Sequence, residues 1–328
     1  MLTAPIMEAI SPNDPILVEE LLRKDSGQII EEIILGFPSA SLITIHDDVD
    51  TSLTIYTENI KKDLIRGWKK DGRAMGDEFE WGKLKLIVED FMVNLEVTFN
   101  ERKIRAYRAL LARTGRSADE YSLVMYLTEK ARKKMRRETG VAFWQAKSVP
   151  NAAQDAPLKD KFDGIRAQAK ALAQANIART NTHPAATNSN AIACVKGNYD
   201  ILPDELKEDG SFTFCAYGFF DKFKSNWEAN NKSNLEVLAI ANTPFTALRL
   251  PFGNGLHYLF PISEFGSDDA LLTTQPDFLS MGYKMLMDWK VKDEGRQLVA
   301  MTDFSVGALI EQRNEGYVVV NNVLIANS

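Results

Sequence analysis

Residues 117–147 read SADEYSLVMYLTEKARKKMRRETGVAFWQAK and carry the strongest helix signal in the chain. Ser117 and Glu120 have the spacing of a capping box, in which the two side chains bond free backbone N–H groups at the start of a helix. Apolar residues then recur at helical spacing until Pro150 stops the pattern. An unbroken helix here would be roughly 45 Å long, from its rise of ~1.5 Å per residue. We predict a long helix that serves as a spine, with Gly140 as the place for an earlier end or a kink.

The chain before this helix is predicted to be mostly β-structure. Residues 84–99 form the clearest strand pattern, and their apolar side chains move from even to odd positions near Glu89, so a β-bulge or tight bend is expected there. Two shorter strand-like runs, 42–45 and 53–56, flank the acidic turn 47–50. Because this turn lacks the glycine and the distal glutamate of a calcium-binding loop, we interpret its carboxylates as solvated.

A highly charged excursion, residues 61–80, interrupts the β region. Eleven of these twenty residues are charged, and three glycines are spaced among them. A segment with so few apolar side chains cannot build a core of its own, and long excursions inside compact proteins are usually functional or disordered. Residues 1–40 are predicted to form an arm that begins irregularly, at three prolines, and continues as one or two amphipathic helices.

Beyond Pro150 the chain alternates between helix and strand patterns, which indicates an α+β middle domain. The expected elements are helices at 159–176 and 219–229 and strands near 212–216, 235–240 and 247–250. The last 60 residues return to strand patterns, with turns at 293–296 and 313–316. We therefore predict a closing three-stranded meander that ends with a strand at 317–320.

The composition is that of an ordinary globular protein, with 328 residues, 45% of them hydrophobic, and a net charge of −6. This charge argues against a protein that is basic all over, as many nucleic-acid binders are. Cys194 and Cys215 do not form a C-x-x-C pair and are expected to be free thiols. The start lacks the pattern of a signal peptide and no stretch could cross a bilayer, so a soluble product made in the cytosol is expected.

Motifs for catalysis are lacking in the sequence. It contains no glycine-rich phosphate or dinucleotide loop, no H-E-x-x-H and no G-x-S-x-G. His46, His183 and His257 lie in different predicted elements, and each is interpreted as a surface or satisfied buried residue. We predict no cofactor, no metal and no catalytic residue.

One stretch of the sequence is strongly basic, although the net charge of the whole chain is negative. Between Glu101 and Arg137 there are twelve Lys or Arg residues and four Asp or Glu residues. Late in the predicted spine helix a basic cluster is formed by Arg132, Lys133, Lys134, Arg136 and Arg137. Two interpretations stay open: a solvated helix face with local ion pairs, or a surface that faces phosphates or an acidic neighbouring subunit. Few aromatic residues lie among these cations, which argues against base stacking on single strands.

The order of these elements resembles the Hong Kong 97-type fold of the major capsid proteins of tailed bacteriophages, which is an α+β fold. Local likeness lies in SADEY and LTEKAR of the spine helix, and in LLTTQPDFL (271–279) and VAMTDFSVG (299–307) of the closing strands. In its general sequence character the chain is most similar to capsid proteins of phages that infect Bacteroidetes-type hosts. The resemblance covers nearly the whole chain, and it consists of loose sequence patterns without a diagnostic motif.

The resemblance implies an arm (1–40), a first part of a peripheral domain (41–154), an axial domain (155–262) and peripheral return strands (263–328). An extended loop at about 60–82 would lie across a neighbouring subunit, with Trp68, Arg73, Phe79 and Trp81 as candidate contacts. With only about 40 residues before the first strand, any scaffolding should be a separate protein.

The expected partners are further copies of the chain in hexamers and pentamers, portal and decoration proteins, and packaged double-stranded DNA bound without sequence preference. No membrane partner is expected. The expected location is the virion, after synthesis in the host cytoplasm. Two alternatives stay open: an encapsulin-type compartment, which shares the fold, and an α+β hydrolase or nuclease without a recognisable motif.

Overall fold

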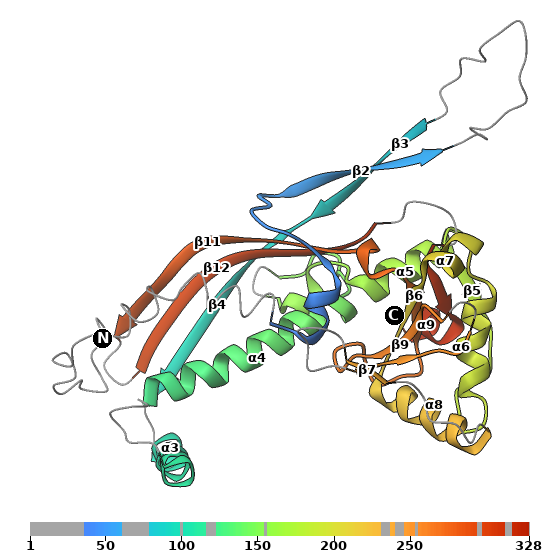
Figure 1. Cartoon of the computed structure of the whole chain (residues 1–328). Coiled ribbons are helices and arrows are strands. Elements are labelled where there is room, and N and C mark those ends of the chain that lie inside the picture. The colour runs from blue at the N-terminus through green and yellow to red at the C-terminus, as the bar shows by residue number, and fades with distance from the viewer. Residues whose placement is uncertain are drawn as a thin grey trace, which may run out of the picture.

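The computed structural model describes residues 36–60, 79–98, 101–115, 123–153, 156–230, 237–239, 246–252, 255–293, 297–311 and 317–327. Their strands form a four-stranded sheet, a two-stranded ribbon and a seven-stranded sheet. Figure 1 shows the long four-stranded sheet lying along one helix, the ribbon projecting away from the body, and the seven-stranded sheet packed among shorter helices at the other end.

The four-stranded sheet has the order β1-β11-β12-β4. Its strands are β1 (Thr44–His46), β4 (Glu89–Thr98), β11 (Leu279–Asp293) and β12 (Gln297–Ile310). β11 and β12 pair antiparallel from Leu279 with Ile310 to Asp293 with Leu298, which confirms the predicted hairpin. One face carries the apolar side chains Phe91, Phe304 and Val306, which join the main core.

The predicted spine helix is confirmed as α4 (Leu123–Gln145). The capping box at Ser117 and Glu120 lies outside the described residues. The C-terminal part of α4 is buried, with Phe143 and Trp144 almost fully covered. Gly140 lies within the helix and does not end it. A Cβ there would lie 2.8 Å from Cγ of Glu264, so the glycine allows close packing.

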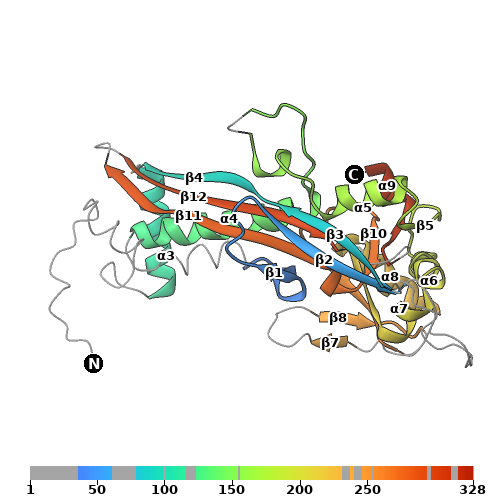
Figure 2. The same ribbon diagram turned by 90° about the horizontal axis from the view of Figure 1, so that it is seen from above.

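The two-stranded ribbon consists of β2 (Ser52–Ile60) and β3 (Phe79–Ile87), paired antiparallel from Ser52 with Ile87 to Ile60 with Phe79. The predicted break near Glu89 is confirmed at Val88, between β3 and β4. This break separates the two strands more completely than a β-bulge would, because β3 pairs with β2 while β4 pairs with β12. The single strand predicted for 84–99 is therefore two strands in two different sheets, as both views show (Figure 1, Figure 2).

The seven-stranded sheet has the order β5-β13-β10-β6-β9-β8-β7. Its strands are β5 (Arg179–Asn181), β6 (Ser211–Cys215), β7 (Val237–Ala239), β8 (Thr246–Arg249), β9 (His257–Pro261), β10 (Leu271–Thr274) and β13 (Val319–Asn321). The helices of this half are α5 (Ile165–Gln174), α6 (Ala191–Asp200), α7 (Asp204–Asp209), α8 (Tyr217–Asn230) and α9 (Asn322–Asn327). Three 3-10 turns complete the described elements: η1 (Pro38–Leu42), η2 (Leu158–Asp160) and η3 (Pro276–Phe278).

The predicted three-stranded meander is wrong in its last strand. β13 does not pair with β12; it pairs with β10 and β5 in the seven-stranded sheet. All three residues of β13 are buried, so no alternation of exposed and buried positions marks one face. Residues 263–328 thus contribute β11 and β12 to one sheet and β10 and β13 to the other. The division into peripheral and axial domains stays a prediction.

A helix that the sequence reading did not predict, α3 (Glu101–Thr114), follows β4 directly. Its arginines, alanines and leucines are good helix formers, and Ile104, Tyr107 and Leu111 recur at helical spacing in the sequence. Figure 1 places α3 beyond the N-terminal end of α4, on the side of α4 that faces away from the four-stranded sheet.

Candidate functional site

The predicted basic cluster divides between two sides of α4. Arg132 and Arg136, one helical turn apart, are half-buried, whereas Lys133, Lys134 and Arg137 are exposed. Lys134 forms an ion pair with Glu138 at 3.5 Å, and both side chains are well exposed. The helical repeat of ~3.6 residues explains this division. Three of the five predicted residues therefore share an outward surface, and two do not.

The prediction did not place the exposed cations of α3. Arg108 and Arg113 of α3 are exposed, and α3 contacts α4. The signal for it was present in the sequence, because the excess of cations begins at residue 102, well before the spine helix.

The predicted extended-loop contacts are only partly described. Phe79 and Trp81 belong to β3, where their backbones pair with Ile60 and Glu58. Trp68 and Arg73 lie outside the described residues. No interaction of these four side chains is established, so their role stays a prediction.

The ribbon presents one mostly polar, exposed face. Tyr56 is 62% exposed and Ile87 is 52% exposed, and the ammonium group of Lys83 lies 5.7 Å from the centre of the Tyr56 ring. The opposite face carries Leu53 and Ile55 of β2, which are only half-buried. Antiparallel strands of this length expose both faces unless another surface covers them. Thr57, further along this opposite face, is buried.

The base of the ribbon crosses the four-stranded sheet at a pair of glycines. Gly282 and Gly307 are direct partners in the β11–β12 ladder. A Cβ on Gly307 would lie 2.0 Å from the carbonyl oxygen of Ile87, and a Cβ on Gly282 would lie 2.9 Å from Cδ2 of Leu86. The backbone N–H of Val88 donates to the carbonyl of Thr51 at 3.2 Å and fixes the crossing. Both glycines therefore permit a close approach between ribbon and sheet.

The acidic turn lies on this same face of the sheet. The ammonium group of Lys284 contacts the carboxylates of Asp48, at 3.1 Å, and Asp50. Hydrogen bonds from Lys284 to these two carboxylates raise the pKa of the ammonium group. The described residues contain no group of three or more His, Cys, Asp or Glu side chains that could hold a metal ion. The turn thus has a lysine partner from within the chain.

His257 is a satisfied core residue. It is 1% exposed, its Nδ1 lies 2.8 Å from Oγ of Ser211, and its Nε2 lies 3.2 Å from the carbonyl of Lys207. Burial lowers the pKa of His257. A serine and a histidine in contact resemble part of a hydrolytic site, but a substrate cannot reach this buried pair. Its geometry ties β6, β9 and α7 together.

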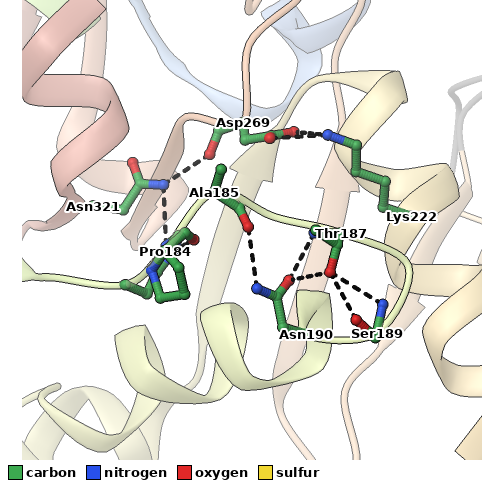
Figure 3. A network of polar contacts seen from close by, with 9 residues as sticks. Pro184, Ala185, Thr187, Ser189, Asn190, Lys222, Asp269 and Asn321 are labelled. Atoms are coloured by element: carbon green, nitrogen blue, oxygen red, sulfur yellow. Dashed lines mark hydrogen bonds and ion pairs between the residues drawn. The ribbon is translucent and has the colours of Figure 1, made fainter.

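His183 belongs to a second structural network, drawn in Figure 3. Its Nε2 lies 3.3 Å from Nδ2 of Asn321, and Asn321 donates to the carbonyl of Asp269 at 2.7 Å. The carboxylate of Asp269 accepts two bonds from Lys222 of α8. The network joins the 183–190 loop, β13 and α8 around the edge of β10, and so stabilises the seven-stranded sheet.

Cys194 and Cys215 are free and buried, as expected. Burial raises the pKa of the Cys194 thiol to about 11 and raises that of Cys215 as well. Both therefore stay protonated at neutral pH, which is the condition of inert structural cysteines. No helix in the described part of the chain combines the length and apolar composition that a membrane span requires.

Comparison with known proteins finds likeness only in structure. No protein-family model matches the chain, and no curated protein sequence matches it. The satellite phage P4 procapsid including size determination (Sid) protein aligns with 90% of this chain and 90% of its own, with 12% identity and a TM-score of 0.59. Gordonia phage Cozz aligns over 86% and 85%, with 12% identity and a TM-score of 0.50. A virus-like particle from Pyrococcus furiosus aligns over 92% and 100%, with 7% identity and a TM-score of 0.48.

These likenesses, together with the element order above, show the fold. The chain has the α+β Hong Kong 97-type fold, in which a long helix lies along a sheet and a β-ribbon projects from it. The match extends over most of both chains.

Proposed function

We propose that the protein is the major capsid protein of a tailed bacteriophage, which self-assembles into the icosahedral or prolate head that encloses double-stranded DNA. Support comes from the fold, which aligns over 90% of the chain with a subunit of a phage procapsid. A fold alone does not define a function, so the proposal depends on a feature of this chain that assembly explains.

That feature is the ribbon β2–β3. An isolated two-stranded hairpin is at best marginally stable in water, yet this one projects from the body with Tyr56 exposed and with Leu53 and Ile55 only half-buried (Figure 1, Figure 2). The surface of a second subunit would cover these side chains. A projecting, incompletely covered ribbon is useful in a subunit that is always surrounded by neighbours.

The remaining expectations form part of the same proposal. The partners are other copies of the chain in hexamers and pentamers, separate scaffolding and portal proteins, decoration proteins, and DNA. The location is the virion, after synthesis in the host cytoplasm. The likeness to capsid proteins of Bacteroidetes phages stays a prediction. A peripheral domain would contain α4 and the four-stranded sheet, and an axial domain would contain the seven-stranded sheet.

We propose a structural role and no catalysis. The polar pocket of ≈ 230 Å³ beside Arg166 contains an internal ion pair between this arginine and Asp268 at 2.7 Å. The described lining of this pocket holds no paired nucleophile and base. The Ser211–His257 pair is buried away from it. The hydrolase alternative therefore gains no support from the described residues.

The test replaces residues 61–78 by an Asn-Gly turn. The Ile60–Phe79 pair at the end of the ribbon can be closed by such a two-residue turn without a change of register. We expect a folded, soluble subunit, with the circular dichroism of the parent chain, that no longer forms shells in negative-stain microscopy. Normal shells from the variant would contradict the role predicted for the extended loop, and substitution of Tyr56 within the retained ribbon would test the ribbon itself.

The content of the particles distinguishes a phage head from an encapsulin-type compartment. Particles recovered from infected cells should contain duplex DNA that resists added nuclease. Particles that contain a packaged protein and no DNA would favour the compartment. If neither infected cells nor expression of the chain alone yields particles, the proposed shell function is wrong.

A further inference from the structure

The ribbon is attached to the four-stranded sheet through two strands of very different length. On one side β3 continues through Val88 into β4, which pairs with β12 along all of its ten residues. On the other side β2 follows β1 and the acidic turn 47–50, and β1 is a parallel edge strand with three pairs, from Thr44 with Ser280 to His46 with Gly282 (Figure 2). Parallel pairing is slightly less stable per residue than antiparallel pairing. β1 is therefore the smaller of the two backbone attachments.

A buried carboxylate lies beside this edge strand. Glu311 directly follows β12 and is 4% exposed, and its backbone N–H donates to the carbonyl of Phe278 at 2.7 Å. The hydroxyl of Ser280, which is also buried, donates to Oε1 of Glu311. A buried carboxylate has lost its hydration, so hydrogen bonds or an opposite charge stabilise it strongly.

His46 of β1 is placed to supply that charge. Its Nε2 lies 3.6 Å from the same oxygen, Oε1 of Glu311. This nitrogen is buried and makes no hydrogen bond within the described part of the chain, and a neutral imidazole gains little from a partner at that distance. A protonated imidazole would donate a charge-assisted hydrogen bond, which is shorter and about twice as strong as a neutral one. The side chain of His46 is 26% exposed, so solvent can deliver the proton.

The other charged groups near His46 are carboxylates and one lysine. Those on the described elements next to β1 are Asp47, Asp48 and Asp50 of the turn, Lys284 of β11, Asp277 of η3 and Glu311. Lys284 is paired with Asp48 and Asp50, and Asp277 is exposed. Histidine is the one side-chain type that ordinarily changes charge between about pH 5 and pH 8. Within this described group, His46 is the residue that responds to pH in that range.

We infer that His46 and Glu311 form a proton-dependent contact that fixes β1, and with it one end of the ribbon, to the four-stranded sheet. When the imidazole takes up a proton, its Nε2–H donates to Oε1 of Glu311, and the buried carboxylate gains a partner of opposite charge. When the proton leaves, β1 keeps its three backbone pairs and the contacts of the turn, but this attraction is lost. The stabilisation is therefore present at acid pH and disappears as the pH rises through the range in which histidine deprotonates.

The sign of this effect separates it from that of the buried histidine in the other sheet. Burial lowers the pKa of His257, so His257 makes the folded protein less stable toward acid. Global unfolding adds the two opposing effects together. Hydrogen exchange of a short edge strand reports its local opening instead, and it is therefore the measurement that isolates β1.

The test follows amide hydrogen exchange of the unassembled full chain by mass spectrometry at about pH 7.5 and about pH 5.5, on either side of the ordinary histidine titration. Exchange times are scaled to the intrinsic rate at each pH. The reporting peptide covers residues 43–50, and α5 serves as the reference segment. The variants are His46→Gln, which cannot titrate, and Glu311→Gln, which removes the carboxylate charge. The matched control is His183→Gln, because His183 contacts Asn321 in the seven-stranded sheet.

In the parent chain we expect protection of the 43–50 peptide, relative to α5, to be about tenfold greater at the acid pH, as a charge-assisted bond predicts. His46→Gln should abolish this difference, Glu311→Gln should remove most of it, and His183→Gln should retain it. Equal protection of the parent chain at both pH values would overturn the inference. A difference that survives in His46→Gln, or one that His183→Gln abolishes as well, would overturn it too.

Glu311→Gln keeps the test decisive if β1 of His46→Gln is detached at both pH values. In that case a full pH difference in Glu311→Gln contradicts the inference, and a strongly reduced one supports it. The experiment uses subunits that have not assembled, so its outcome does not depend on the proposed shell function. A chain that never forms shells can still show the pH difference, and a chain that forms shells can lack it.

Discussion

Gly307 is the residue at which the ribbon and the sheet approach most closely. We predict that Gly307→Ala lowers the free energy of unfolding by about 1–3 kcal/mol, the usual cost of overpacking, because a Cβ there would meet the backbone oxygen of Ile87 at 2.0 Å. Backbone cannot move aside without disturbing the Val88–Thr51 hydrogen bond. Urea unfolding followed by circular dichroism measures the loss.

Two other glycines serve as controls for this prediction. Gly282→Ala should cost less, since its nearest atom, 2.9 Å away, is the end of the flexible Leu86 side chain. Gly218→Ala meets nothing within 4 Å and lies in α8, where alanine is favoured over glycine by up to about 1 kcal/mol. If all three variants had equal stability, the close crossing described above would be wrong.

His257 is expected to make stability depend on pH. Burial lowers the pKa of His257 in the folded protein, so below the ordinary histidine pKa of about 6.5 the unfolded chain binds the proton first. The contribution of this residue is complete above about pH 6.5 and is lost as the pH falls through the lowered pKa. The stability of the parent chain should therefore decline from neutral pH toward about pH 5.

The matched variant for this prediction is His257→Gln, which keeps a donor for the carbonyl of Lys207 and does not titrate. Its free energy of unfolding, measured in urea at several pH values, should fall less steeply on the acid side than that of the parent chain. His46 and His183 are unchanged in both proteins, so only the difference between the two slopes reports on His257. Identical slopes would show that His257 does not contribute to the pH dependence of stability.

Among the elements, those with a local pattern could be predicted from the sequence. The spine helix was predicted because its apolar residues repeat over many turns, and the structure has it at Leu123–Gln145. The β11–β12 hairpin was predicted because its long strands alternate around a turn. The break near Glu89 was predicted from the change of phase. Each of these signals lies within one segment, so no knowledge of distant residues was needed.

Elements that depend on distant partners could not be predicted. β13 has three residues, all buried, and its sheet is determined by Asn321, whose side chain bonds Leu271 and Asp269 about fifty positions away. The α3 helix was missed although Ile104, Tyr107 and Leu111 recur at helical spacing in the sequence. The separation of the basic cluster into two sides of α4 followed from helical geometry.

At the scale of elements, we predict that Asn321 attaches β13 to the seven-stranded sheet. Its side chain accepts from the N–H of Leu271 at 2.9 Å and of Leu324 at 3.0 Å, and it donates to Asp269 at 2.7 Å. Asn321→Ala would leave these backbone groups buried without those partners, at a cost of about 2–4 kcal/mol.

Hydrogen exchange measures this effect locally. Amides of β10 and β13 should lose protection in Asn321→Ala before those of β11 and β12 do. The control is Asn188→Ala in an exposed loop, which should change the stability by less than about 0.5 kcal/mol. Uniform loss of protection in both sheets would mean that the two sheets unfold as a single unit.

The whole molecule combines two features that a shell subunit needs. Its ribbon extends beyond its own core, and its long helix links the ribbon-bearing sheet to the seven-stranded sheet (Figure 1). The sequence predicted the projecting segment and the long helix through local patterns and through resemblance. The way the two sheets are joined needed the structure, because β10 and β13 of one sheet flank β11 and β12 of the other in the sequence.

The most direct measurement is a cryo-electron microscopy reconstruction of particles formed by the expressed chain. We predict closed shells in which the ribbon of each subunit lies on a neighbouring subunit, so that the side chains around Tyr56 are covered. A protein that stays monomeric under all assembly conditions would contradict the account. Shells in which the ribbon folds back on its own subunit would contradict it equally.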